Sequence, residues 1–470
     1  MRRTKMVCTV GPATASAEML RKMIRAGADV LRLNFSHSTP AEHRQTAMRI
    51  RSIAKELKKP VAILQDLPGP KIRIGTFEQK SIQLRTGAIF TLTTADVIGD
   101  ERRVSVTYDR LPQELRKDQT ILLADGAVEL RVENLKPREI DCRVIVGGAL
   151  SSRKGVNVPR GAVNLSAFTD KDREFLSIGM DMGVDVVALS FIRSPSDIER
   201  ARKSIASADR DTPLMAKIEK PEALDQFDEI LAAVDAVMVA RGDLGVEIPL
   251  AEVPFVQKNI IVKAVNAGKP VVTATQMLRS MVESKRPTRA EVADVANAVL
   301  DGSDALMLSE ESAVGAYPIE AVQTLAEVAE AAEKRLVNRN LFPNERSQGY
   351  SNTGEAIGHA ACVLARGAGA SAIVCCTRTG RTARLVAKHR PAMPIIAASP
   401  SDKVVKRLML TWGVLPALVG EFDSSDRIVE AAVTAARECG LIPAAAKVVV
   451  ASAAPEKAER EGDFLRVVAI

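Results

Sequence analysis

Polar side chains recur at the points where short apolar runs of this sequence end. Along the chain they are Arg32 and Asn34, Asp66, Ser190, Lys217 and Glu219, Arg241 and Asp243, Thr275, and Ser309 with Glu311. A single polar residue after a buried strand is uninformative, because strands commonly end in polar turns. A whole series is hard to ascribe to chance if the strand ends share one rim.

The residue types in this series fit a hard metal ion and an anionic ligand. Glu219 and Asp243 would end neighbouring strands, and Mg²⁺ typically takes one or two carboxylates together with water and substrate oxygens. Lys217 lies two residues before Glu219, so both side chains share one strand face. With Arg32 and Arg73 as further cations and few bases, the set is typical of phosphoryl transfer, where stabilising charge does most of the work.

Several of these residues also have an ordinary structural explanation. Lys217 and Glu219 could form a structural ion pair at the rim, since ion-pair networks also occur in clefts. Thr275 and Ser309 could cap helices. Both interpretations stay open at this point.

The stretch Arg241-Gly242-Asp243 also admits two interpretations. Read alone, it is a cell-adhesion signal. Read as a strand end, it places the backbone amides of Gly242 and Asp243 at a helix N-terminus, where they could hold a carboxylate. Among the histidines, only His37 lies near the candidate site, and His43 is expected at the surface.

Short apolar runs alternate with amphipathic stretches over residues 4–310. The runs cover 4–10, 30–35, 61–66, 184–191, 214–219, 236–241, 270–275 and 305–310. This alternation predicts parallel strands joined by right-handed crossovers. Eight runs favour an α/β fold with a (β/α)8 TIM barrel, whose strand ends would gather the polar series. A doubly wound sheet is the alternative, but no G-x-G-x-x-G follows any run.

The long gap between the third and fourth runs has a different pattern. Period-two alternation and turn signals predict a small all-β barrel domain inserted at 70–155. The TIM-barrel catalytic domain would then take 1–69 and 156–340. A polar, glycine-containing stretch at 344–355 predicts a linker, and strands alternating with helices predict a C-terminal open α/β domain at 345–470.

The composition excludes several classes of function. The 470 residues carry a net charge of +7 without a long basic block, and 3% are aromatic, which argues against a nucleic-acid partner. No apolar run reaches membrane-spanning length, and the one after the basic start is too short for a signal peptide. Cys375 and Cys376 could be redox-active, but AIVCCT fits a strand interior better. We therefore expect a reduced, cytoplasmic protein without membrane contact.

Eight motifs of the chain are distinctive when taken together. They are RLNFSH (32–37), DLPGPKIR (66–73), KGVNVP (154–159), SFIRS (190–194), AKIEKPEAL (216–224), MVARGDLGVEIP (238–249), ATQMLRSM (274–281) and PTRAEVADVANAVLDGSDALMLSEESAVGAYP (287–318). Over essentially the whole barrel they resemble the pyruvate kinase family, in its bacterial form without an extra C-terminal domain. The resemblance implies transfer of the phosphoryl group of phosphoenolpyruvate to ADP, giving pyruvate and ATP, with Mg²⁺ or Mn²⁺ as cofactor. This is the final step of glycolysis.

The resemblance also implies a role for individual residues. The catalytic set is Lys217, Arg32, Thr275 and Ser309; the substrate-binding set is Arg32, Ser190, Gly242, Asp243 and Thr275; the metal ligands are Glu219 and Asp243; and the nucleotide side is Asn34, His37, Arg73 and Lys154. Lys217 would stabilise the phosphoryl transition state and the developing enolate. Thr275 and Ser309 would lie where the enolate is protonated through water. The inserted domain, which carries Lys154, would close as a lid and exclude water. A homotetramer is expected from the family.

Two positions depart from the family members that need potassium. Many members have a glutamate after Gly-Pro and a threonine after the aspartate, whereas this chain has Lys71 and Leu67 there. A lysine ammonium can supply the positive charge that potassium would supply. We therefore expect potassium-independent activity, although Asn34, Ser36 and Asp66 of the monovalent site remain.

Other departures concern regulation and the lid. The segment Thr377, Arg378, Thr379, Gly380, Arg381 and Thr382 resembles the family's effector phosphate loop, so a phosphorylated effector is expected there. Its partner loop is usually rich in glycine, whereas 452–464 has a single glycine. Ser38 replaces the usual glycine after NFSH, and Ala124 replaces the first of two usual aspartates. Both are expected to retune the lid without abolishing catalysis.

Two competing functions remain. Another metal-dependent barrel enzyme acting on phosphoenolpyruvate or pyruvate, such as a mutase or an aldolase, would share the rim residues. It would not need Lys154 on an inserted lid. A catalytically dead homologue that binds nucleotide and regulates a partner would keep the fold without the activity.

Overall fold

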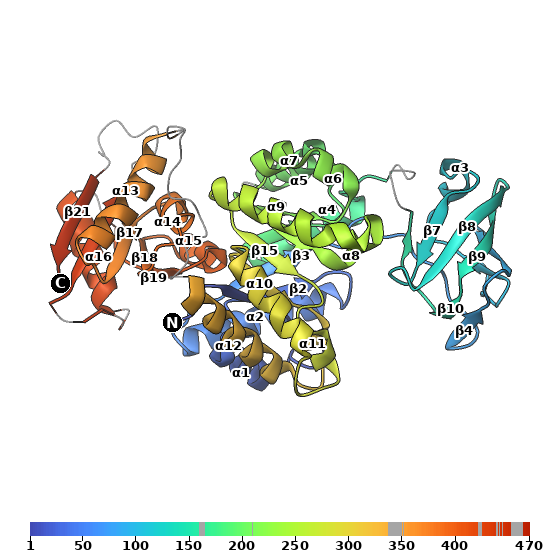
Figure 1. Cartoon of the computed structure of the whole chain (residues 1–470), viewed down its shortest axis with the longest axis horizontal. Helices are drawn as coiled ribbons and strands as arrows, with labels where there is room; N and C mark the ends of the chain where they lie inside the picture. The colour runs from blue at the N-terminus through green and yellow to red at the C-terminus, as the bar shows by residue number, and fades with distance from the viewer. Residues whose placement is uncertain are drawn as a thin grey trace.

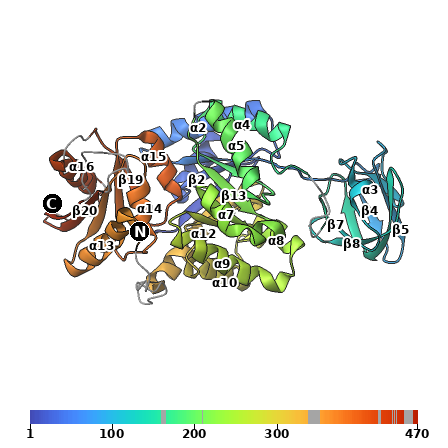
Figure 2. The same ribbon diagram turned by 90° about the horizontal axis from the view of Figure 1, so that it is seen from above.

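The computed structural model describes residues 1–158, 165–208, 210–336, 350, 352–421, 425–438, 440, 442–443, 445–452 and 464–470. Three bodies lie in a row in both ribbon views (Figures 1 and 2). A barrel occupies the middle, an all-β insert projects from one end of it, and a C-terminal α/β body covers the opposite end.

The barrel is a closed ring of parallel strands in the order β1-β16-β15-β14-β13-β12-β3-β2. The strands are β1 (Lys5–Thr9), β2 (Val30–Asn34), β3 (Ala62–Asp66), β12 (Val186–Leu189), β13 (Leu214–Ile218), β14 (Ala236–Ala240), β15 (Val271–Ala274) and β16 (Ala305–Leu308). This confirms the TIM barrel and excludes the doubly wound sheet. Because helices cover the outside and side chains fill the inside, nearly every strand residue is buried, as the continuous apolar runs predict.

Helices wrap the barrel between successive strands. They are α1 (Ala17–Ala26), α2 (Pro40–Glu56), α4 (Asp170–Met182), α5 (Pro195–Ser207), α6 (Pro221–Asp225), α7 (Phe227–Ala233), α8 (Arg241–Glu247), α9 (Val253–Asn266), α10 (Arg289–Leu300), α11 (Glu310–Ala313) and α12 (Pro318–Leu336), with 3₁₀ turns η1 (Leu250–Glu252) and η2 (Arg279–Val282). Capping boxes begin α2, α4 and α10, where a threonine and an acidic residue three positions later satisfy the free amides of the first turn.

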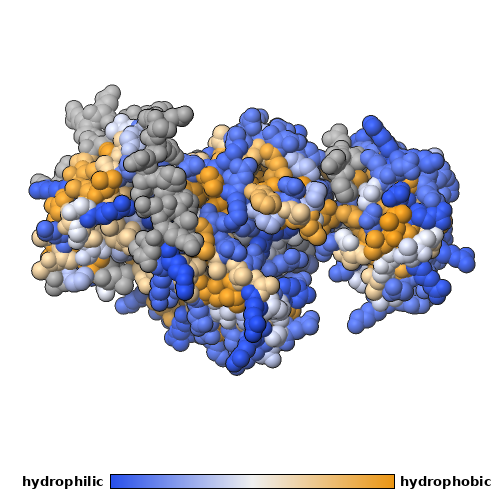
Figure 3. Space-filling view, viewed as in Figure 1, coloured by the Kyte–Doolittle hydropathy of each residue, from blue (hydrophilic) through white to orange (hydrophobic). Residues whose placement is uncertain are grey.

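The insert lies between β3 and α4. Its elements are β4 (Ser81–Leu84), β5 (Ile89–Thr93), β6 (Arg103–Ser105), α3 (Leu111–Glu114), β7 (Thr120–Leu123), β8 (Val128–Leu135), β9 (Glu139–Val146), β10 (Gly148–Ser151) and β11 (Val156–Asn157). They form a six-stranded sheet, β11-β7-β8-β9-β5-β6, and a two-stranded sheet, β10-β4. The alternating pattern of β4 and β8 buries every second side chain in a core separate from that of the barrel. A gap opens between barrel and insert beside the segments that join them (Figure 3).

The C-terminal body is an open sheet in the order β19-β18-β17-β20-β21, parallel except for its last strand. Its elements are α13 (Thr353–Gly367), β17 (Ala372–Cys376), α14 (Arg381–Ala387), β18 (Ile395–Ser399), α15 (Asp402–Arg407), η3 (Leu408–Leu410), β19 (Val414–Leu418), α16 (Ser425–Glu438), β20 (Lys447–Ser452) and β21 (Phe464–Ala469). Met409 and Leu410 of η3 reach into the core inside the barrel, so this body plugs the barrel floor. The exact domain boundaries stay a prediction.

The cysteines that the structure describes are free and buried. Cys375 and Cys376 lie in β17, as expected for a strand interior, and burial raises the pKa of the Cys376 thiol to about 12. Cys439 lies outside the described residues. None of the described helices combines the length and apolarity needed to cross a membrane.

Candidate active site

Arg32 and Asp66 form a buried ion pair where β2 and β3 end. Arg32 Nε donates to Asp66 Oδ2 at 2.7 Å, and its Nη1 donates to Thr9 Oγ1 at 2.9 Å. Burial alone would raise the pKa of the Asp66 carboxyl, but the charges of Lys217 and Arg32 outweigh it and lower that pKa. The guanidinium is therefore held in one orientation at the rim of the barrel.

Lys217, near the end of β13, lies at the centre of the same group. Its Nζ donates to Ser190 Oγ at 2.7 Å and lies 2.9 Å from Glu219 Oε1 and 3.4 Å from Asp66 Oδ1. Burial disfavours its charge, but the two carboxylates overcome burial and raise the pKa of Lys217 above its usual range. The ammonium is therefore charged at any working pH. The predicted structural ion pair with Glu219 is present, and the geometry is also compatible with a functional role.

Glu219 and Asp243 are two carboxylates whose charges act on each other, as the ligands of one divalent cation would. Glu219 is fully buried, and its Oε1 accepts no aligned hydrogen bond from the described residues. Burial first, and then the charge of Asp243, raise the pKa of Glu219, although Lys217 opposes both. Lys217 Nζ, 2.9 Å from Oε1, supplies one positive charge to this buried carboxylate, and a divalent cation shared with Asp243 would supply more. The described residues contain no cluster of three His, Cys, Asp or Glu side chains suited to a metal. Water and substrate would therefore complete the ligands around these two carboxylates, as Mg²⁺ prefers.

The Arg241-Gly242-Asp243 stretch forms the first turn of α8. Arg241 donates to Asp294 Oδ1 and to the carbonyl oxygen of Thr275, both at 2.7 Å. Because this guanidinium fixes the neighbouring strand end, it is not available as an adhesion signal. The Gly242 amide, expected to face a carboxylate, donates to Thr275 Oγ1 at 2.7 Å. Thr275, which follows the neighbouring strand β15, thus caps α8. This agrees with the structural alternative that the sequence left open, in which Thr275 caps a helix.

A basic face adjoins this rim. Lys71 Nζ lies 3.3 Å from Asp243 Oδ1, between the segment leading to the insert and the end of β14. His37 is exposed, and partial burial, followed by the charges of Arg73, Arg32 and Lys71, lowers the pKa of its imidazole. Cations from both the barrel and the approach to the insert therefore converge here, as a polyphosphate side requires.

The other residues predicted for the site make hydrogen bonds outside the group around Lys217. Asn34 Oδ1 accepts from the Ser36 amide at 3.1 Å, which makes a tight turn after β2. Arg73 donates to the carbonyl oxygen of Arg153 within the insert. Lys154 is exposed on the insert. Ser309 starts α11 without capping it through its hydroxyl, and its amide donates to Glu311 Oε2 at 2.7 Å.

Left-handed backbone marks several of these positions. Phe191 (φ 56°) presents its amide to Glu219 Oε2 at 2.7 Å, and Thr275 has φ 69°. A β-branched residue in this region is a true outlier, and such strain of about 1–3 kcal/mol concentrates at functional sites. Ser38 (φ 64°) and Ala124 (φ 52°) also have positive φ. The family's glycine at the first position would adopt that conformation without strain.

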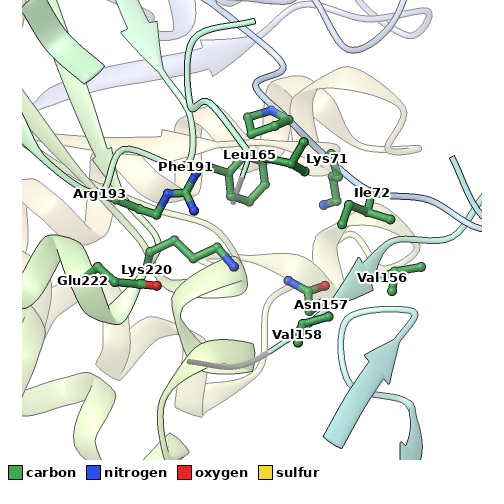
Figure 4. Close-up of a pocket in the computed structure, with 11 residues that line it drawn as sticks. Lys71, Ile72, Val156, Asn157, Val158, Leu165, Phe191, Arg193, Lys220 and Glu222 are labelled. Atoms are coloured by element: carbon green, nitrogen blue, oxygen red, sulfur yellow. The ribbon is translucent and has the colours of Figure 1, made fainter. Parts of the chain in front are cut away.

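The joint between insert and barrel holds residues that the sequence did not single out. Lys220 Nζ and Asn157 Nδ2 both donate to Glu247 Oε1, at 2.6 and 3.2 Å. Lys220 and Asn157, with Lys71 and Phe191, line a narrow pocket of about 50 Å³ (Figure 4). Asn157 lies in β11 and Glu247 at the end of α8, so this bond ties the insert to the barrel. The motif KGVNVP contained the signal, but its partner lies far along the chain.

The prediction that His43 lies at the surface is wrong. It is buried, with its ring stacked on Phe35 at 4.1 Å between centroids, and its Nε2 lies 2.9 Å from the carbonyl oxygen of His37. The ring packs inside because the turn after β2 folds back over α2. It thereby supports the segment that carries His37.

The predicted effector loop forms a tight turn between β17 and α14. Thr377 Oγ1 accepts from the Gly380 amide at 2.9 Å, and Gly380 has φ 80°. Thr377 and Thr382 are buried, whereas Arg378 Nη1 lies 3.2 Å from Glu421 Oε2. Most of the expected partner loop, 453–463, lies outside the described residues.

Comparisons with known proteins agree with this geometry. The chain matches the family models described as pyruvate kinase, barrel domain, over residues 1–322 and pyruvate kinase, alpha/beta domain, over residues 355–468. It is 49% identical to pyruvate kinase 2 of Synechocystis sp., over 93% of this chain and 74% of that protein. It is 44% identical to the pyruvate kinase of Thermotoga maritima, over 97% of each. A crystal structure of a pyruvate kinase from Cryptosporidium parvum aligns with a TM-score of 0.90 at 35% identity, covering 100% of this chain and 96% of that one. The chain therefore belongs to the pyruvate kinase family.

Proposed function

We propose that this pyruvate kinase transfers the phosphoryl group of phosphoenolpyruvate to ADP at the barrel rim, and that it does so without potassium. The observation that carries the proposal is the position of Lys217, whose charged Nζ lies within 3.4 Å of Ser190, Glu219 and Asp66. Family membership supports the same reaction and argues against a mutase or an aldolase.

Glu219 and Asp243 would hold Mg²⁺ or Mn²⁺, which when bound neutralises charge on the phosphoryl and enolate oxygens. The donor set supports this assignment, because two carboxylates suit Mg²⁺ and the charge of Asp243 acts on buried Glu219. The ion pair between Lys217 and Glu219 would then loosen, since the cation takes over part of the carboxylate charge. Lys217 would be free to approach the transferring phosphoryl group.

The chain's own side chains perform the remaining tasks. Arg32, oriented by Asp66 and Thr9, offers donors to the substrate phosphate, and Ser190 keeps Lys217 in place. The Gly242 and Asp243 amides would receive the substrate carboxylate once Thr275 Oγ1 releases the Gly242 amide. Thr275 and Ser309 would then orient the water that protonates the enolate. Preorganised charge of this kind is commonly the largest contribution to catalysis.

Asn34, His37 and Arg73 would bind the nucleotide phosphates, and Lys154 would join them when the insert closes as a lid. The lowered pKa of His37, caused by burial and three neighbouring cations, supports an anion at this face. The hydrogen bond from Asn157 to Glu247 ties the insert to the barrel at the joint about which it would turn. Closure would exclude water from the reacting phosphoryl group.

Lys71 would replace potassium. Its Nζ lies 3.3 Å from Asp243, which brings a fixed positive charge to the substrate side of the rim. Asn34, Ser36 and Asp66 would remain as a vestigial monovalent site.

A phosphorylated effector at Thr377–Thr382, a homotetramer and a cytoplasmic location are further parts of the proposal, expected from the family. The domain limits 1–69 with 156–340, 70–155 and 345–470 are proposed as well.

The test is pyruvate formation from phosphoenolpyruvate, ADP and Mg²⁺, coupled to lactate dehydrogenase, in sodium-only and in potassium buffers. Equal strong rates are expected in both. Lys217→Met should lower the rate by about 100-fold or more, and Lys22→Met, on the exposed surface of α1, is the matched control. A rate that rises more than about tenfold with potassium, a difference of about 1.4 kcal/mol, would refute potassium independence only. No rate in either buffer, with intact folding, would instead favour the catalytically dead homologue.

A further inference from the structure

The aspartates at the barrel floor repeat one arrangement. Asp29, Asp185, Asp235 and Asp304 each stand directly before a strand, and these strands, β2, β12, β14 and β16, are every second one around the ring. Each carboxylate accepts a hydrogen bond from an amide near the start of the barrel strand before it. The four amides belong to Met6, Ile63, Leu214 and Val271, at 2.9, 2.7, 2.9 and 3.1 Å. In return, each aspartate amide donates to the carbonyl oxygen of the same residue.

An arginine completes each of these four units, which we call floor clamps. Its Nη2 donates both to the aspartate and to the carbonyl oxygen two residues before the aspartate. The arginines are Arg2 with Asp29, Arg51 with Asp185, Arg202 with Asp235 and Arg390 with Asp304, and the carbonyl groups belong to Gly27, Gly183, Ala233 and Gly302. Each floor clamp therefore ties the starts of two neighbouring strands together through charge-assisted hydrogen bonds.

The fourth floor clamp differs from the others in the origin of its arginine. The other three arginines come from the barrel itself, from the segment before β1, from α2 and from α5. Arg390 follows α14 in the C-terminal body, and Figures 1 and 2 show α14 lying against the barrel. The amide of Trp412, in the same body, also donates to Asp304 Oδ1 at 3.0 Å. The C-terminal body thus supplies the arginine of one floor clamp.

This clamp holds the seam with the shortest ladder of the ring, between β15 and β16. Val272 lies in register with Ala305 and Thr273 with Leu306, whereas every other pair of neighbouring barrel strands has three or more such residue pairs. The ion pair in this clamp is also the most buried of the four, with side chains that are 8% and 5% exposed. Water screens such a pair little, and few ladder bonds share its task.

The two strands of this seam lead to residues proposed for the site. Thr275 follows β15 and Ser309 follows β16 at the rim. Thr275 has left-handed backbone, with φ 69°, and a strained residue keeps such a conformation only while its surroundings hold it. Because β15 is four residues long, or about 13 Å, a tilt at its floor end displaces its rim end.

We propose that Arg390 is a positioning residue of this enzyme: through Asp304 it fixes the floor end of β15 against β16, and thereby the places of Thr275 and Ser309 at the rim. The inference rests on the proposed function, from which it takes the role of these two residues in enolate protonation. Positioning can act far from the chemistry, since a misplacement of about 1 Å costs about 100-fold in rate.

The first readout is the exchange of pyruvate methyl hydrogens with deuterated water, followed by NMR in the presence of Mg²⁺ and ATP. This exchange reverses the protonation of the enolate, so it reports on Thr275 and Ser309. Arg390→Met should slow it by about fivefold or more and leave the KM for ADP unchanged, because the nucleotide side lies on other segments of the rim and on the insert. Arg390→Lys, which keeps the charge beside Asp304, should recover part of the rate.

Arg3→Met is the matched control. The Arg3 guanidinium also lies over the Trp412 ring, at 5.4 Å, but it donates to the carbonyl oxygen of Ala392 in the C-terminal body. The control therefore removes a contact between the same two bodies and leaves the floor clamp intact. It should exchange methyl hydrogens at the rate of the parent.

The second readout is amide hydrogen exchange of the full chain, followed by mass spectrometry of short peptides. In Arg390→Met the Val271 amide should exchange about tenfold faster or more, because its clamp opens locally. The amides of Met6 and Ile63, which belong to intact clamps, should keep the rates of the parent. This readout tests the clamp independently of activity.

Two results would overturn the proposal: equal methyl exchange in Arg390→Met and Arg3→Met, or unchanged exchange of the Val271 amide. If Arg390→Met does not fold, Arg390→Lys carries both readouts with smaller expected effects, and parent-like values in both would overturn the proposal as well. A parent that exchanges no methyl hydrogen would refute the proposed function and with it the positioning role, while the amide readout would still decide whether Arg390 holds β15.

Discussion

Replacing Lys71 by glutamine removes the fixed charge at the rim and leaves a neutral polar side chain that is one atom shorter. At the 3.3 Å that separates Nζ from Asp243 Oδ1, a unit charge pair is worth about 1 kcal/mol in water and about 5 kcal/mol at an effective dielectric constant of about 20. Both side chains are about a quarter exposed, at 26% and 25%, so solvent screening favours the lower half of that range. We assume that the Lys71 ammonium attracts the anionic transition state as strongly as it attracts Asp243. The variant should then lose about 1–3 kcal/mol of transition-state stabilisation, which corresponds to about 5- to 150-fold in kcat/KM.

The assay is coupled pyruvate formation by the parent and by Lys71→Gln in buffers with sodium or potassium as the only monovalent cation. The parent should be indifferent to the cation. The variant should be slow in sodium and recover in potassium, because Asn34, Ser36 and Asp66 remain as ligands. A variant as fast as the parent in sodium would show that the ammonium contributes no charge to the reaction. A variant that stays slow in potassium would show that Lys71 does not stand in for that ion.

Three further outcomes follow from the structure. Lys217→Met should lower kcat by about 100-fold or more in the coupled assay, because it removes the charge nearest the transferring group. Chelation should abolish activity until Mg²⁺ or Mn²⁺ is restored, and Glu219→Gln should weaken Mn²⁺ binding by about tenfold or more in a paramagnetic resonance titration; unchanged binding would contradict the assignment. Hydrogen bonds from Arg407 lower the pKa of Asp211 to about 2, below its unfolded value, so the stabilisation is present above about pH 4 and is lost as pH falls towards 2. In urea unfolding, Asp211→Asn should therefore cost at most about 1 kcal/mol at pH 7, and this gap should close on acidification.

The barrel could be predicted from the sequence because its strands are buried on both faces. The apolar run 61–66 became β3 (Ala62–Asp66), and 236–241 became β14 (Ala236–Ala240), each within one residue at either end. Closure of the barrel then follows from the number of strands and the handedness of their crossovers. For the same reason the polar residues after the strands had to share a rim. The roles of the rim residues stay predictions.

Other features depend on contacts that no local pattern encodes. The approach of Lys71 to Asp243 joins residues far apart in the sequence, and it arises from the path of the segment leaving β3. The burial of His43 is a further example, because it depends on Phe35, in the preceding turn, whose ring stacks on the imidazole. The place of Arg384 beside Asp235 and Pro270 of the barrel is likewise invisible in the sequence, because it results from the packing of two separate bodies.

The antiparallel bridge between Arg73 and Gly155 has a consequence for the polymer physics of this chain. The chain enters the insert at Arg73 and leaves it at Gly155, so the bridge closes the insert into one loop of about 80 residues. Closing a loop of this length costs only about 4 kcal/mol in chain entropy. A tight turn joining residues near 70 and 158 would therefore shorten the chain without opening the ring of strands. The same argument explains how a whole module can sit between two consecutive barrel strands: doubling its length would add only about 0.6 kcal/mol to the cost of folding.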